Sequence, residues 1–208
     1  YLIVATNKHI TKTRNKAGAK RLSYAQQTFY TPKSINSMNK MRGNIFLITG
    51  NGAGKTASAL GMALRASGHK QKVLMLQFMK GRKDIGEYKV QSQLKTFKVY
   101  QFGRKEFVHL NQPELEDLKL AQKGLEFVRK IKKYPDILIL DELNLAISTG
   151  MLKSEDVIAV LNKIPAKCNV FITGRYASPK MMEYADYVNE ILLLKAPKEM
   201  KTRKGIEF

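Results

Sequence analysis

The stretch Thr49-Gly50-Asn51-Gly52-Ala53-Gly54-Lys55-Thr56 decides how the rest of the sequence is interpreted. It follows an apolar run, Ile45–Thr49, and precedes an amphipathic run, Lys55–Ser67, which is the strand–loop–helix context of a phosphate-binding loop. Glycines let backbone N–H groups converge on phosphate oxygens, and the amino end of a helix adds partial positive charge. The usual pattern has glycine where Thr49 stands. A glycine-rich turn without a ligand is the alternative.

Two side chains of this stretch carry expected chemistry of their own. Lys55 is placed to neutralise phosphate, and the Thr56 hydroxyl is placed to hold Mg²⁺ (or Mn²⁺). The loop therefore predicts a site for a nucleotide with its metal ion.

A second motif, Ile137-Leu138-Ile139-Leu140-Asp141-Glu142, places two carboxylates directly after four apolar residues. Open α/β sheets bind their ligands at the carboxyl ends of the strands. In nucleotide-binding domains such acids reach Mg²⁺ directly or through water. By itself the motif also fits a solvated acidic turn, but together with the loop it predicts an ATP–Mg²⁺ site.

Apolar runs rich in Val, Ile, Leu and Phe recur along the sequence, as buried parallel strands do. They predict strands at Ile45–Thr49, Val73–Phe78, Phe97–Phe102, Ile137–Leu140, Val170–Thr173 and Tyr187–Leu194. The stretches between them predict helices at Lys55–Ser67, Pro113–Lys133, Ser154–Ile164 and Pro179–Tyr184. This alternation predicts an α/β fold with a mostly parallel sheet and helices on both faces. Together with the glycine-rich loop, it indicates the P-loop NTPase-like (recombinase-like) class.

The charge of the chain is strongly basic and unevenly distributed. The formal net charge is +20, and residues 1–43 hold nine Lys and Arg without one acidic residue. We predict that residues 1–40 form a basic, mostly disordered extension and that residues 41–208 form the domain. An anionic partner would suit this charge, so a nucleic-acid-stimulated ATPase, with Glu142 activating water, is an alternative function. A non-catalytic nucleotide-binding regulator is a further one.

Several classes of protein are excluded by composition. The single cysteine, Cys168, rules out a disulfide framework and a multi-cysteine metal site, and it favours a reducing compartment, the cytoplasm. No apolar run approaches the roughly 20 residues that span a bilayer.

Three separated blocks of the sequence resemble those of one family. They are TGNGAGKTASALGMALRASGHKQKVLMLQFMKG, DILILDELNLAISTGML and VFITGRYASPKMMEYADYVNEI, and they are followed by KGIEF. From about Met41 to Phe208 the chain is similar to the P-loop ATP:corrinoid adenosyltransferases. The resemblance implies transfer of the 5′-deoxyadenosyl group of ATP to the reduced cobalt of a corrinoid, with release of triphosphate. It also implies a homodimer, and we expect an electron-donor protein for the cobalt. From the charge distribution and the short apolar runs we expect no specific nucleic-acid binding and no membrane binding.

The same resemblance assigns roles to residues. The loop residues that would grip triphosphate are Gly50, Asn51, Gly52, Gly54 and Lys55, with Ala53 among them where the family usually has lysine. Thr56 and Glu142 would hold Mg²⁺, with Asp141 behind them. The catalytic set would be Lys55, Glu142 and Arg175, where Arg175 contacts the nucleotide or the corrinoid edge, and Phe107 would press on the lower corrin face. The alternatives are a surface arginine that caps a strand end for Arg175 and an ordinary core residue for Phe107. Tyr176 departs from the asparagine that is commoner in the family.

Overall fold

The computed structural model describes residues 42–106, 110, 112–199 and 202–206. The chain divides into two compact units, Tyr1–Ile35 and Asn36–Phe208. The first unit and the rest of the predicted extension lie outside the described residues, so the predicted extent of the extension stays a prediction.

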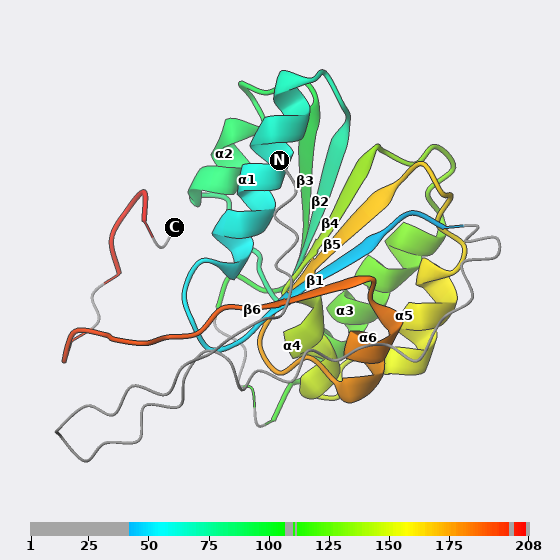
Figure 1. Cartoon of the computed structure of the whole chain (residues 1–208). Coiled ribbons are helices and arrows are strands. Elements are labelled where there is room, and N and C mark those ends of the chain that lie inside the picture. Colours follow the sequence, from blue (N-terminus) through cyan, green and yellow to red (C-terminus); the bar gives the residue numbers. More distant parts are fainter. Residues whose placement is uncertain (1–41, 107–109, 111, 200–201, 207–208) are drawn as a thin grey trace, which may run out of the picture. The chain divides into compact units, whose positions relative to one another are not determined.

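The second unit is built on one sheet of six strands, in the order β3-β2-β4-β5-β1-β6 (Figure 1). Every neighbouring pair is parallel. The strands are β1 Ile45–Thr49, β2 Val73–Phe78, β3 Phe97–Phe102, β4 Ile137–Asp141, β5 Asn169–Thr173 and β6 Tyr187–Glu190. The predicted strands are therefore present, and all their carboxyl ends lie along the same edge of the sheet.

Helices cover both faces of this sheet (Figure 1). They are α1 Lys55–Gly68, α2 Gly86–Val90, α3 Leu115–Arg129, α4 Leu143–Ser148, α5 Ser154–Leu161 and α6 Pro179–Tyr184. One buried cluster joins the sheet to α3, α4, α5 and α6, and a second joins the opposite face to α1. The predicted fold class, an α/β fold of the P-loop NTPase-like kind, is confirmed.

The α1 helix packs closely because its buried face is made of alanines. Ala59, Ala63 and Ala66 recur at helical spacing and are at most 3% exposed. Small side chains let the helix backbone approach the strands, so the loop that precedes α1 is held against the end of the sheet.

The α3 helix begins later than the predicted range Pro113–Lys133 because its start is fixed by a capping box. The Glu114 side chain caps the first turn, and the Asp117 carboxylate accepts the Glu114 N–H at 2.9 Å. Arg104 donates two further hydrogen bonds to Asp117 at 2.8 and 2.9 Å. The last basic residues of the predicted range lie beyond the end of the helix at Arg129.

The last strand also ends earlier than predicted, at Glu190 rather than Leu194. Its neighbour β1 ends at Thr49, so residues after Glu190 have no strand to pair with. The Ile191 carbonyl instead accepts the Gly52 N–H at 2.8 Å, and the Leu193 N–H donates to Asn51 Oδ1 at 3.0 Å. The chain thus leaves the sheet and contacts the glycine-rich loop.

Two short helices, α2 and α4, were not predicted. Each has six residues or fewer, too few for a clear helical period. The α4 helix begins directly after the acidic pair, and its buried residues are Leu143, Asn144, Ala146 and Ile147. Among the described residues, no helix is long and apolar enough to cross a membrane.

Candidate nucleotide site

The order of the strands brings the predicted motifs together. The strands β4, β5 and β1 are neighbours in the sheet, and their carboxyl ends carry the acidic pair, Gly174-Arg175 and the glycine-rich loop. These segments are far apart in the sequence, yet the loop after β5 lies between the other two at one edge of the sheet.

The glycines of the loop are required by two different constraints. Gly50 and Gly54 have φ of +100° and +102°, values that side chains rarely tolerate. At Gly50 a Cβ atom would also lie 2.3 Å from the Ile191 carbonyl oxygen, and at Gly52 it would meet Ile191 at 2.8 Å. Space around Gly54 is open. The first part of the loop is therefore occupied by the chain after β6, and the part beside α1 is free for a ligand.

Some groups of the loop that the resemblance assigned to triphosphate already have partners. The Gly52 N–H donates to Ile191, and Asn51 Oδ1 accepts from Leu193. Ala53 is exposed and offers backbone alone. In this arrangement the Gly52 N–H contributes to the shape of the loop.

Lys55 is the buried cation of the loop, with 7% of its surface exposed. Its Nζ donates to the Gly52 carbonyl at 2.6 Å. Burial lowers the pKa of Lys55, as does the positive charge of Arg175, and the charge of Glu142 opposes them in part. The ammonium lies within the loop, where a bound phosphate would compete for it.

Thr49 stands where a phosphate-binding loop usually has glycine, and the structure gives this residue a contact. Its Oγ1 accepts the Ala177 N–H at 3.3 Å. The hydroxyl thereby links the end of β1 to the loop that follows β5.

Asp141 is fully buried and accepts a hydrogen bond from four side chains. Its Oδ1 accepts from Thr56 at 2.8 Å and from Thr173 at 2.7 Å. Its Oδ2 accepts from Lys80 at 2.7 Å and from Gln77 at 3.3 Å. Burial alone would raise the pKa of Asp141, but Lys80 and these hydrogen bonds outweigh it and hold the pKa below its ordinary value.

Lys80 was not among the predicted site residues. It follows β2, and β2 is the neighbour of β4 in the sheet, so the two residues meet across that pair of strands. Burial favours the neutral amine, but the charges of Asp141, Glu142 and Glu87 outweigh it, and the pKa of Lys80 is raised. Lys80 lies near the end of the first sequence block that resembles the family, but its contact with Asp141 depends on the strand order.

The environment of Glu142 differs from that of Asp141 in its hydrogen bonds and in the direction of the pKa shift. It adopts a left-handed conformation, with φ of 59°, and its N–H donates to Thr173 Oγ1 at 3.0 Å. Its Oε2 is buried and has no hydrogen-bond partner among the described residues. Burial raises the pKa of Glu142, as does the neighbouring charge of Asp141, while Lys80, Lys55 and Arg175 oppose the shift.

Arg175 is exposed at the end of β5, in the place that the sequence predicted. Its charge acts on both Lys55 and Glu142. The structure thus brings the three predicted catalytic residues to one edge of the sheet. Phe107, predicted to face the corrin, lies outside the described residues.

The oxygen atoms around Asp141 and Glu142 fit a magnesium ion. The Thr56 proton is engaged by Asp141, which leaves the hydroxyl lone pairs available, and Glu142 Oε2 lacks a partner. Mg²⁺ commonly takes only one or two protein ligands together with water and phosphate oxygens. Among the described residues there is no cluster of three or more His, Cys, Asp or Glu side chains that could hold a metal ion.

A cavity of about 220 Å³ lies on the other side of the acidic pair, at the ends of β2 and β3. Its basic lining residues are Lys80, Arg82, Arg104 and Lys105, and Glu87 and Glu106 are its acidic ones. The acidic pair therefore has the glycine-rich loop on one side and this cavity on the other.

An all-parallel α/β sheet with a glycine-rich loop between β1 and α1 defines a P-loop NTPase-like domain. Residues 41–208 match the family described as ATP:corrinoid adenosyltransferase BtuR/CobO/CobP. The chain belongs to this family, so the family predicted from the three sequence blocks is confirmed.

Curated relatives agree with this assignment. The chain is 36% identical over 171 residues to the corrinoid adenosyltransferase of Pseudomonas aeruginosa, covering 80% of this chain and 84% of that protein. It is 33% identical over 172 residues to the corrinoid adenosyltransferase of Escherichia coli K12, covering 80% and 86%. A Sinorhizobium protein of the same name is 30% identical over 176 residues, covering 80% and 81%.

Proposed function

We propose that this chain transfers the 5′-deoxyadenosyl group of ATP to the reduced cobalt of a corrinoid and releases intact triphosphate. The observation that supports this most directly is the meeting of Lys55, Glu142 and Arg175 at one edge of the sheet, in a chain of this family. The reductant of the cobalt, the homodimer and the cytoplasmic location remain predictions.

In this reaction no side chain of the protein needs to form a covalent bond to the substrates. Reduced cobalt is itself the nucleophile: its electron pair forms the bond to the 5′ carbon, and the bond from that carbon to the triphosphate oxygen breaks. The cobalt is thereby oxidised by two electrons, and the leaving oxygen keeps the pair of the broken bond. The protein must align the two reactants and stabilise charge on the departing triphosphate.

Each site residue has a part in that task. Lys55 and the open end of the loop at Gly54 would bind the phosphates, and Arg175 would lie along the nucleotide. Thr56 and Glu142 would hold Mg²⁺, which supplies positive charge to the triphosphate when bound. Asp141, whose four donors occupy both of its oxygens, would act through Thr56.

Product analysis tests this proposal. The full chain is incubated with ATP, Mg²⁺ and a chemically reduced corrinoid, and the products are separated in the dark. We expect a light-sensitive adenosylated corrinoid and one intact triphosphate for each. Formation of ADP and orthophosphate alone, without need of a corrinoid, would refute the transferase and favour the alternative ATPase.

A further inference from the structure

Tyr176 adopts a backbone conformation that a bulky residue rarely takes. Its φ is 57°, in the left-handed region, where a side chain with a Cβ atom crowds its own backbone. Residues held in such conformations collect at ligand sites, where the surrounding structure fixes them. Tyr176 therefore calls for an explanation in terms of function.

Packing does not supply that explanation. The residue is 66% exposed, one of the most exposed large side chains of the domain. Within the described part of the chain, no aromatic ring contacts the Tyr176 ring, and no hydrogen bond involves its hydroxyl. The ring is consequently available to a ligand.

The backbone on both sides of Tyr176 is held in place. Before it, the Asn144 amide donates to the Gly174 carbonyl at 3.3 Å, and a Cβ at Gly174 would lie 2.9 Å from the Leu145 nitrogen. After it, the Ala177 N–H contacts Thr49 Oγ1 at the start of the glycine-rich loop. A fixed backbone orients the ring in advance, which lowers the entropic cost of binding.

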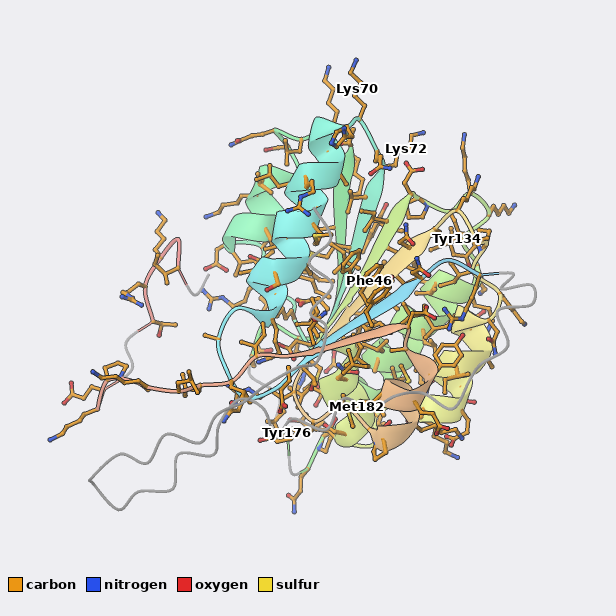
Figure 2. The ribbon with its side chains drawn as sticks, viewed as in Figure 1. Phe46, Lys70, Lys72, Tyr134, Tyr176 and Met182 are labelled. Atoms are coloured by element: carbon orange, nitrogen blue, oxygen red, sulfur yellow. The ribbon has the colours of Figure 1, made fainter. Side chains whose placement is uncertain are left out.

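The position of Tyr176 favours contact of its ring with the nucleotide rather than with the corrinoid, the larger of the two proposed substrates. Figure 2 shows Tyr176 at the end of the sheet opposite Lys70 and Lys72, the end where the strands finish. The loop after β5 lies between the acidic pair and the glycine-rich loop, because β5 lies between β4 and β1. The cavity at the ends of β2 and β3 lies beyond the acidic pair. A nucleotide with its phosphates on the glycine-rich loop would thus bind beside the loop that carries Tyr176.

We infer that the Tyr176 ring is a stacking face for the adenine base of ATP. The inference rests on the proposed function, because it takes the triphosphate to lie on the loop beside Lys55. Every base has a flat π face that an aromatic side chain can cover, whereas tripolyphosphate has none. The two ligands therefore separate the role of the ring from the role of the loop.

The test compares equilibrium binding of ATP and of tripolyphosphate, each with Mg²⁺, to the full chain by calorimetry. Tyr176→Asn removes the ring and places at this position a residue that tolerates the left-handed region. We expect the affinity for ATP to fall about five- to tenfold, the lower end of the range for loss of a stacked base. Affinity for tripolyphosphate should stay within about twofold, because the variant leaves the phosphate-binding groups in place.

A further variant controls for indirect effects. Tyr176→Phe keeps the ring and should recover most of the lost ATP affinity. Urea unfolding of Tyr176→Asn should show a midpoint no lower than that of the wild type.

Three results would overturn the inference. An equal loss for ATP and tripolyphosphate would mean that the ring acts through the conformation of the loop. Unchanged ATP affinity, with a weaker apparent affinity for the corrinoid, would place the ring against the corrinoid instead. A wild-type chain that binds neither ligand would refute the proposed function as well. If the chain shows the expected Tyr176 effect but makes no adenosylated corrinoid, only the proposed function fails.

Discussion

Asp141 and Glu142 are consecutive carboxylates at the end of β4, and their surroundings differ in almost every respect. Asp141 ends the strand and accepts hydrogen bonds from four side chains. Glu142 turns into the left-handed region, and its buried Oε2 has no described partner. The pKa of the first is lowered and that of the second is raised. Paired acids whose environments separate them in this way commonly have separate roles.

The difference shows how neighbouring residues can stabilise the fold and still leave an oxygen atom available to bind a cation. A saturated carboxylate stabilises the junction of β4 with β2, β5 and α1, because its donors come from β2 and the residue that follows it closely, from β5 and from α1. A carboxylate with an unused oxygen costs stability until a cation supplies the missing partner. The following predictions test whether Asp141 stabilises the fold and Glu142 binds a cation.

The largest expected effect is on stability, in Lys80→Met. This variant leaves the Asp141 charge buried without its cation, so the free energy of unfolding should fall by about 3–5 kcal/mol. Urea denaturation measures the change. The matched control is Lys180→Met, which breaks the exposed pair of Lys180 with Glu155 and should cost no more than about 0.5 kcal/mol. Equal losses in the two variants would show that Asp141 does not depend on Lys80.

Lys55→Ala should have the largest effect on turnover. It removes the buried cation beside Glu142, and loss of one such electrostatic contact lowers kcat/KM by about 100- to 1,000-fold. The initial rate of corrinoid adenosylation gives the value. The unfolding free energy should change little, because the Lys55 Nζ bonds to a backbone carbonyl of its own loop. A folded variant with normal turnover would remove Lys55 from the site.

Glu142→Gln should separate activity from stability. If Glu142 holds Mg²⁺, kcat/KM should fall by about 10- to 100-fold, and the Mg²⁺ concentration for half-maximal rate should rise. The free energy of unfolding should not fall, because the neutral amide avoids an ionised group in a buried position. Glu116→Gln, an exposed residue in the first turn of α3, is the control and should change neither quantity. A marked loss of stability in Glu142→Gln would contradict the contrast with Asp141.

The smallest expected effect is a dependence on pH without Mg²⁺. The raised pKa of Glu142 means that the folded chain holds this proton to higher pH than the unfolded chain does. Wild-type stability should therefore decline relative to Glu142→Gln as the pH rises above about 4.5, the ordinary value. The contribution of Asp141 to stability depends on pH in the opposite direction. This contribution is lost as the pH falls below about 3.8 through the lowered pKa of Asp141. Unfolding curves at several pH values show the difference, and parallel stability profiles would refute it.

The sequence predicted the parts of this fold that depend on local pattern. The strands were found because each is a short apolar run, and the acidic pair because it directly follows one of them. Arg175 was assigned through the family resemblance, and its place shortly after the apolar run Val170–Thr173 agrees with the end of β5. The start of α3 and the early end of β6 were missed, because a capping contact sets the first and the end of a neighbouring strand sets the second.

The rest of the site depends on contacts between distant residues. The pairing of Lys80 with Asp141 needs β2 beside β4, and the use of the Gly52 N–H by Ile191 needs β6 beside β1. Neither neighbour relation is visible in a local pattern. The short helices α2 and α4 were missed for a related reason, since tertiary packing rather than periodicity stabilises them.

The contact of Ile191 and Leu193 with the glycine-rich loop also sets an order of events during synthesis. The loop is translated early, but the residues that fix its shape are translated about 140 positions later. Until β6 has joined β1, the Gly52 N–H and the Asn51 side chain lack these partners. The nascent chain can therefore form the other strand pairs before its nucleotide site is complete, so competence to bind ATP should be gained late in synthesis.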